Sequence, residues 1–239
     1  MSTSSRWHEP HTRRWAFAEL IALSSLVLGA VGSGVASAST GTTETVGFDF
    51  SYTKPGAGAM ADAGYDFAIG YVSHNPAKNL TAGQVAAYRD AGIHVGLVWE
   101  TTDGRALEGR AAGAEDGRAA ENQADILDYP DGAVIFFAVD TNTTTTDYPA
   151  IKAYAEAFHQ ATRRPVGIFG EADVLDHFVK GGRSTVQYGW QTAAWSHGRV
   201  SDKADLYKRV GHPSRPVPDG ISPRSFDEVV AIQPVPLAR

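Results

Sequence analysis

The chain has 239 residues, no cysteine and a formal net charge of −6 at pH 7. The acidic balance and the lack of a basic stripe exclude a protein that tracks nucleic-acid phosphates, so no nucleic-acid partner is expected. The absence of Cys excludes disulfides, thiol catalysis and Cys-based zinc sites, and the length allows one domain or at most two.

The first 38 residues have the pattern of an export signal. The paired arginines Arg13 and Arg14 precede an apolar run that ends in the sequence ASA at residues 36–38. Small residues at this spacing suit signal peptidase, and the twin arginines resemble a Tat signal, with a Sec signal as the alternative. We therefore expect a signal peptide over residues 1–38, a short linker over 39–44 and a single domain over 45–239.

An uncleaved membrane anchor is the alternative interpretation of the same segment. An apolar run of about 20 residues is long enough to span a bilayer. The Gly and Ser content and the ASA ending favour cleavage instead. We expect no stable membrane span after cleavage, and a protein that is secreted or associated with the cell envelope.

From residue 44 onward, apolar runs typical of strands alternate with stretches typical of helices. The expected strands cover residues 45–52, 65–73, 93–101, 133–140, 165–171, 187–195, 204–210 and 225–232. The expected helices cover residues 57–64, 80–92, 108–129, 147–163 and 171–182. Thr81 and Gln84 form a capping box, whereas Gly109, Gly113 and Gly117 weaken the third helix. Between the last three strands, helices are short or missing.

This alternation predicts a parallel sheet that is covered on both faces. A (β/α)8 TIM barrel and a doubly wound open sheet both fit it. The loop after the first strand, SYTKPGAGAMADAG, lacks the third glycine of a dinucleotide-binding fingerprint, which disfavours the open sheet. The expected fold class is α/β, a compact (β/α)8 TIM barrel with short or missing helices toward the C-terminus.

Acidic residues recur at the ends of the expected strands. They are Asp49, Glu100, Asp140, Glu171 and Asp227. An Asp after a strand is often only a turn residue or a helix cap. In a barrel, however, the strand C-termini meet on the face that carries the chemistry. Five acids in one pattern therefore indicate a shared cleft.

Crowded carboxylates push their pKa values apart, so that one holds a proton while another is ionised. Glycoside hydrolysis needs this division. Tyr71, Trp190 and Gln191 are expected to line the same mouth and to bind substrate together with Asp227. An acidic face can also bind Ca²⁺ or Mg²⁺, but His residues with ligand spacing are absent from the sequence, and we expect no metal and no other cofactor.

Six segments, in their order along the chain, resemble a known family. They are GFDFSY, AGIHVGLVWE, AVIFFAVD, PVGIFGE, WQTAAW and FDEVVA. They resemble the glycoside-hydrolase-like TIM-barrel domain of exported actinobacterial proteins, long catalogued as a domain of unknown function and similar to the family 25 lysozymes. The resemblance covers about residues 45–232.

The resemblance assigns positions to four residues. Asp49 matches the Asp of the first strand in family 25 lysozymes. Asp140 matches the first acid of a D-x-E motif whose Glu is the general acid, and Asn142 occupies the position of that Glu. Asp227 matches the first residue of a D-x-N-like motif on the last strand.

The resemblance implies cell-wall glycan or another carbohydrate as the partner, and two functions remain open. The first is an exported, lysozyme-like hydrolase. In it, Asp49 and Asp140 would stabilise an oxocarbenium-like centre or position an N-acetyl group, and Glu100 or Glu171 would donate the proton. The second is a catalytically inactive barrel that binds cell-wall carbohydrate. A metal-dependent deacetylase or phosphodiesterase is disfavoured because the sequence lacks His ligand spacing.

Overall fold

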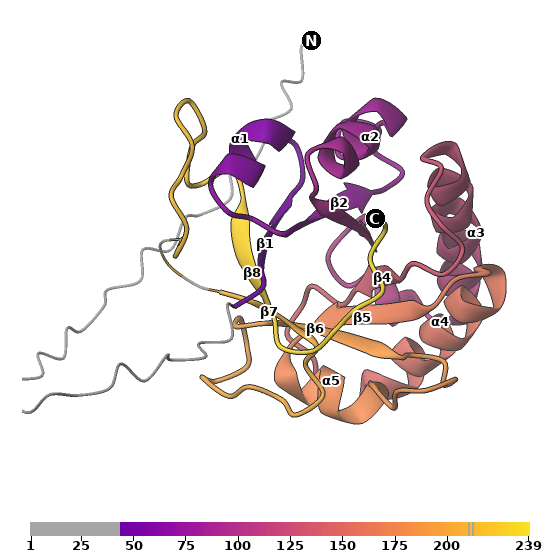
Figure 1. Cartoon of the computed structure of the whole chain (residues 1–239). Coiled ribbons are helices and arrows are strands. Elements are labelled where there is room, and N and C mark those ends of the chain that lie inside the picture. The colour runs from indigo at the N-terminus through magenta and orange to yellow at the C-terminus, as the bar shows by residue number, and fades with distance from the viewer. Residues whose placement is uncertain (1–43, 210, 212) are drawn as a thin grey trace, which may run out of the picture. The chain divides into compact units, whose positions relative to one another are not determined.

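The computed structural model describes residues 44–209, 211 and 213–239, so the expected signal peptide lies outside the described residues. Eight strands pair in chain order, β1 to β8, and close into a barrel whose outer face carries the helices (Figure 1). The (β/α)8 barrel expected from the sequence is confirmed. No helix among the described residues is long and apolar enough to cross a membrane.

The elements follow the predicted order closely. The strands are β1 (Val46–Phe50), β2 (Phe67–Val72), β3 (His94–Trp99), β4 (Ile135–Ala138), β5 (Val166–Gly170), β6 (Tyr188–Thr192), β7 (Leu206–Lys208) and β8 (Asp227–Ala231). The helices are α1 (Ala57–Asp62), α2 (Ala82–Asp90), the 3-10 turn η1 (Arg105–Glu108), α3 (Arg110–Ile126), α4 (Tyr148–Ala161) and α5 (Ala172–Phe178). Beyond α5 the described residues form no further helix, which agrees with the expected thinning toward the C-terminus.

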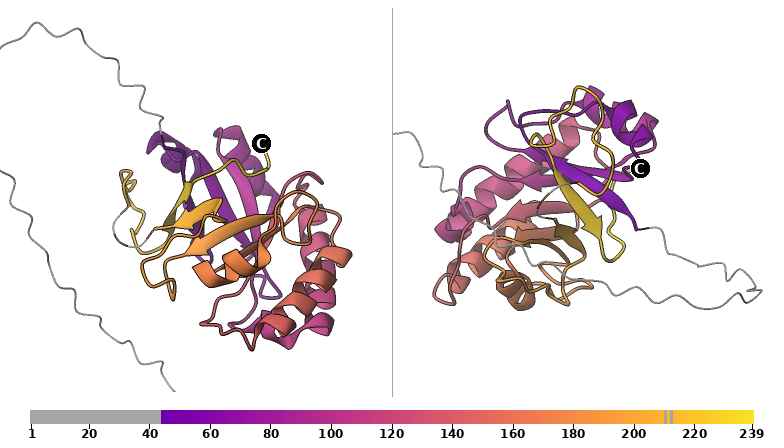
Figure 2. Two further views of the ribbon diagram at one scale, coloured as in Figure 1. Left: turned by 90° about the horizontal axis from the view of Figure 1, so that it is seen from below. Right: turned by 90° about the vertical axis from the view of Figure 1, so that its left-hand side faces the viewer.

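One strand contradicts the prediction of a wholly parallel sheet. β8 pairs antiparallel with both of its neighbours, β7 and β1, whereas the other neighbouring pairs are parallel (Figure 2). A parallel return needs a crossover, usually a helix, and the described residues between β7 and β8 contain none. The reversal sets Asp227, the first residue of β8, opposite Asp49 of β1. Asp227 therefore reaches the rim at which the parallel strands end.

Side-chain alternation divides the core into two layers. Successive residues of a strand point to opposite faces. Phe48 and Phe137 belong to the large cluster packed beneath the helices. A second cluster fills the barrel interior, and it comprises Phe67, Ile69, Tyr71, Val98, Val134, Phe136, Phe169, Trp190, Leu206 and Val229. A polar residue that follows one of these inward-facing residues by two positions on a parallel strand therefore points toward the mouth of the barrel, where the parallel strands end.

The C-terminal segment, residues 232–239, closes the opposite end of the barrel (Figure 1). The backbones of Val95 and Ala238 exchange two hydrogen bonds of 2.8 Å, and the backbone N–H of Val134 donates to the carbonyl of Pro236 at 2.9 Å. These residues lie where β3 and β4 begin. The antiparallel β8 delivers the chain to this end, which leaves the other rim to the strand-end acids.

The glycines of α3 allow a close helix contact. A Cβ atom at Gly113 would overlap the carbonyl oxygen of Tyr154 in α4, and a Cβ atom at Gly117 would lie 2.7 Å from the carbonyl oxygen of Phe158. The two helices run side by side on the outside of the barrel (Figure 1). Glycine costs helix propensity at these positions, but it lets the backbones of α3 and α4 approach each other.

Replacing Gly113 with alanine is expected to lower the free energy of unfolding by about 2 kcal/mol, because overpacking outweighs the gain in helix propensity. Urea unfolding followed by circular dichroism measures the change. Gly83→Ala in α2 is the matched control, because a Cβ atom there has no neighbour within 4 Å, and it should leave stability unchanged or slightly higher. Equal stability of the Gly113 variant and the wild type would refute the close contact.

Candidate active site

A lysine on β7 joins two carboxylates at the rim. The Nζ of Lys208 lies 3.1 Å from the Oδ1 of Asp49 and 2.8 Å from the Oδ2 of Asp227. The Asp49 side chain is buried, whereas that of Asp227 is 56% exposed. The cluster therefore extends from the barrel interior to the solvent, and it brings together acids from the first and last strands.

The electrostatics of this cluster centre on Asp49. Burial, aided by the charge of Asp227 and opposed by that of Lys208, raises the pKa of Asp49 to about 7. Burial alone would lower the pKa of Lys208, but the charges of the two carboxylates outweigh it and raise that pKa. The Oδ2 atom of Asp49 is buried and has no hydrogen-bond partner among the described residues. Asp49 can therefore carry a proton near neutral pH.

Tyr71 lies close to several of the strand-end acids. Its hydroxyl lies 3.5 Å from the Oδ1 of Asp49. Burial raises the pKa of Tyr71 well above its ordinary value, and the charges of Asp49, Glu100, Asp140 and Asp227 raise it further. Acids that come from β1 and β8 and from the loops after β3 and β4 therefore surround one mouth.

Glu100, directly after β3, is bound by a second lysine. The Nζ of Lys78 lies 2.6 Å from the Oε1 of Glu100, and both side chains are largely buried. Lys78 comes from the loop between β2 and α2, and its ammonium also lies 5.7 Å from the centre of the Tyr71 ring. The Glu100 carboxylate is thus engaged by a cation at the side of the mouth.

Asp140, two residues after β4, differs from the other acids at the mouth. It is partly exposed, and its carboxyl group makes no hydrogen bond or ion pair with the described residues. Burial raises the pKa of Asp140, and the charges of Glu100 and Asp103 raise it further. The charges of Lys208 and Lys78 oppose this shift. Asp140 is therefore an unengaged carboxyl group whose environment favours the protonated form.

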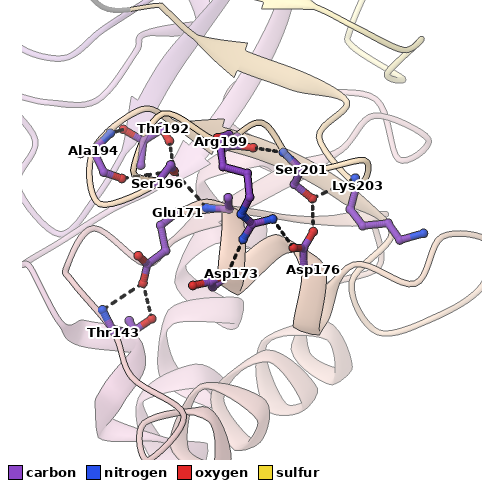
Figure 3. A network of polar contacts seen from close by, with 12 residues as sticks. Thr143, Glu171, Asp173, Asp176, Thr192, Ala194, Ser196, Arg199, Ser201 and Lys203 are labelled. Atoms are coloured by element: carbon purple, nitrogen blue, oxygen red, sulfur yellow. Dashed lines mark hydrogen bonds and ion pairs between the residues drawn. The ribbon is translucent and has the colours of Figure 1, made fainter.

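Glu171 is hydrogen-bonded to the loop after β4 and does not contact Lys208. Its Oε1 accepts hydrogen bonds from the backbone N–H of Thr143 at 3.0 Å and from the Thr143 hydroxyl at 2.5 Å (Figure 3). Glu171 is buried and stands at the N-cap of α5. The carboxylate fixes the loop that follows Asp140, so the structure gives it a supporting place rather than a place in the cluster around Lys208.

Two residues expected at the mouth lie in other places. Trp190 is 1% exposed and packs inside the barrel against Phe136 and Phe169, with ring centres 5.9 Å and 4.6 Å away. Gln191 is fully buried, donates to the carbonyl of Arg199 at 2.7 Å and accepts from the N–H of Ser201 at 2.7 Å. Trp190 therefore fills the core, and Gln191 anchors the loop between β6 and β7.

Sequence reasoning missed the two lysines. Lys208 had a usable signal, because it stands two positions after the inward-facing Leu206 and so shares its face of the strand. Lys78 had none, since it lies in an irregular loop. The described residues contain no group of three or more His, Asp or Glu side chains placed to hold a metal ion.

Comparisons with known proteins agree with this architecture. The Rv2525c-like, glycoside hydrolase-like domain family matches residues 58–216 of the chain. No curated protein matches the sequence. Among solved structures, the Tat-secreted protein Rv2525c from Mycobacterium tuberculosis, in complex with L-tartrate, is 19% identical with a TM-score of 0.67, covering 81% of this chain and 98% of that one.

Two lysozyme-type structures share the fold at lower identity. The bacterial lysozyme from Streptomyces coelicolor is 14% identical with a TM-score of 0.51, covering 80% of this chain and 93% of that one. A family 25 glycosyl hydrolase from Bacillus anthracis is 11% identical with a TM-score of 0.51, covering 80% and 90%. Because the family match spans well over half of the sequence, the chain belongs to the Rv2525c-like, glycoside hydrolase-like domain family.

Proposed function

We propose that the protein hydrolyses a glycosidic bond of cell-wall glycan at the mouth of the barrel, with Asp140 as the proton donor. The observation that carries this proposal is the state of Asp140. It combines partial exposure, a raised pKa and a carboxyl group without a partner among the described residues. A general acid needs these properties near neutral pH.

The other acids fit this role less well. Glu171 accepts two hydrogen bonds from Thr143, and Glu100 lies 2.6 Å from the ammonium of Lys78. One or the other of these two residues was expected from the sequence to be the proton donor. Asn142 is exposed and has no carboxyl group to donate a proton. Asp140 is thus the acid best suited to protonate a leaving group.

The proposed reaction uses two carboxyl groups in different roles. Asp140 donates its proton to the glycosidic oxygen while the bond from that oxygen to the anomeric carbon breaks. Asp49, held by Lys208, stabilises the positive charge that develops at the anomeric carbon when its carboxyl group is ionised. Water then adds to the anomeric carbon, and its proton returns to Asp140.

A cell-wall substrate is supported by the lysozyme fold of the neighbouring structures, although fold alone does not fix activity. The alternative function is carbohydrate binding without hydrolysis. One observation favours it, because lysines already engage Asp49, Asp227 and Glu100 and thereby reduce the negative charge available to stabilise a cationic transition state.

Incubation of the purified protein with peptidoglycan separates the two functions. Hydrolysis releases soluble reducing ends, and binding without hydrolysis removes the protein from solution when the peptidoglycan is pelleted. We expect release of reducing ends, with an activity that declines as the pH rises through the raised pKa of Asp140. Co-sedimentation without any release would establish carbohydrate binding without hydrolysis. If the protein neither releases reducing ends nor co-sediments with peptidoglycan, both proposed functions are overturned.

We further propose that the protein is exported by the Tat pathway and cleaved after Ala38. The twin arginines of the sequence and the description of Rv2525c as Tat-secreted support this. N-terminal sequencing of the extracytoplasmic protein is expected to begin at Ser39. A chain that keeps its first 38 residues would instead support a membrane anchor.

A further inference from the structure

A partly buried lysine ties two loops together beside the mouth. The ammonium of Lys54 donates to the backbone carbonyls of Ser51, Tyr52, Ala77 and Lys78, the last two at 2.8 Å and 3.1 Å. Burial lowers the pKa of Lys54. The four carbonyls compensate for the lost hydration of the ammonium. The loop after β1 is thereby fixed to the loop after β2.

Tyr52 stands on this clamped loop, two residues after the end of β1. Its side chain is 59% exposed, and it is the aromatic member of the exposed large apolar side chains in the described part of the chain. The Nδ2 of Asn75 donates to its hydroxyl at 3.3 Å. The Lys78 ammonium lies 5.9 Å from the centre of its ring, within cation–π range. Tyr52 is thus an apolar ring that is exposed to solvent but held in place.

The Tyr52 ring is continuous with the candidate active site. The same Lys78 ammonium lies 2.6 Å from Glu100 and 5.7 Å from the centre of the Tyr71 ring. The hydroxyl of Tyr71 in turn approaches Asp49. A row of side chains therefore leads from Tyr52 at the outer rim to the buried carboxyl group, without a break.

We propose that Tyr52 is a sugar-binding subsite, on which one pyranose ring of the glycan stacks outside the mouth of the barrel. This inference rests on the proposed glycan function and assigns a binding residue to it. The flat ring face buries the apolar C–H face of a sugar, and Asn75 and Lys78 offer N–H donors to the hydroxyl and acyl oxygens of the sugar. The Lys54 clamp holds the ring in place before binding, which reduces the entropy lost on association.

The test is titration calorimetry with a β-1,4-linked N-acetylglucosamine tetrasaccharide, in a chain that carries Asp140→Asn so that the ligand is not cut. Adding Tyr52→Ala is expected to weaken binding about tenfold, which corresponds to about 1.4 kcal/mol. Adding Tyr52→Phe should change the dissociation constant less than twofold, because the ring face remains. Ile126→Ala, at an exposed apolar position on α3, is the matched control and should not change it.

The outcomes distinguish this inference from the proposed function. Unchanged binding by the Tyr52→Ala chain, with binding by the parent chain, overturns the subsite and leaves the function standing. An equal loss in the Phe variant overturns stacking, because the loss then belongs to the hydroxyl group. A parent chain that binds no tetrasaccharide, together with a wild type that neither cuts nor binds peptidoglycan, overturns the function and the subsite with it.

Discussion

Replacing Lys208 with methionine is expected to lower the free energy of unfolding by about 2 kcal/mol at pH 8, and by about 1 kcal/mol or less at pH 5. Methionine keeps most of the length and apolar character of the side chain but removes the ammonium. At pH 8, the buried carboxyl group of Asp49 then loses its counter-charge. At pH 5, Asp49 is already protonated and has little need of the ammonium.

The sign of this pH dependence follows from two pKa shifts. The folded protein raises the pKa of Asp49 to about 7 from an ordinary 3.8, so it binds this proton more tightly than the unfolded chain does. The stability contributed by Asp49 is greatest below the ordinary value and is lost as pH rises through about 7. Since the charge of Lys208 lowers the pKa of Asp49, its removal extends that loss to higher pH. Lys208 itself, whose pKa is raised, stays charged throughout this range.

Urea unfolding of the variant and the wild type at both pH values measures the effect. Lys180→Met, at an exposed lysine after α5, is the matched control and should cost less than about 0.5 kcal/mol at either pH. A loss that is the same at pH 5 and pH 8, or no loss at all, would show that Lys208 does not hold the charge of Asp49.

Most of the barrel could be predicted because its signals are local. Continuous apolar runs and helix periodicity place each strand and helix within a few residues of its observed bounds. The direction of β8 does not follow from the residues of the strand itself. Its signal was the short or missing helix before the last expected strand, because a parallel return needs a crossover that is usually a helix. Asp227 reached the expected rim only because the strand is reversed.

The candidate site was predictable where the position along a strand decides it. Asp49, Glu100, Asp140 and Asp227 share one mouth, as their strand-end positions indicate. A strand-end position does not reveal a hydrogen-bond partner, and Glu171 is engaged by Thr143 from a loop without a sequence signal.

Alternation would have separated Trp190 from Gln191. Neighbouring residues of a strand point to opposite faces, so the two side chains cannot both line the mouth. Trp190 takes the inward position one layer below the rim, and Gln191 takes the outward position beneath the loop between β6 and β7. The same rule would have drawn attention to Lys208, two residues after Leu206.

The proposed proton donor is tested by Asp140→Asn. General acid catalysis contributes about 10²- to 10⁴-fold, so the rate of reducing-end release from peptidoglycan should fall at least about 100-fold. The stability of the variant should be unchanged or slightly higher, because the fold already disfavours the ionised form of Asp140. Lost activity in a chain of unchanged stability then reflects the missing proton.

The rate of reducing-end release by the Asp140→Asn variant, relative to the wild type, tests most directly whether the barrel cuts glycan with Asp140 as the proton donor. The matched control is Asp90→Asn, which removes an exposed carboxylate at the end of α2, near the start of β3 rather than at its end. The expected result is near-complete loss of release by the Asp140 variant and wild-type release by the control. Release at the wild-type rate by the Asp140 variant would contradict the proposal that the mouth of the barrel cuts glycan through this acid.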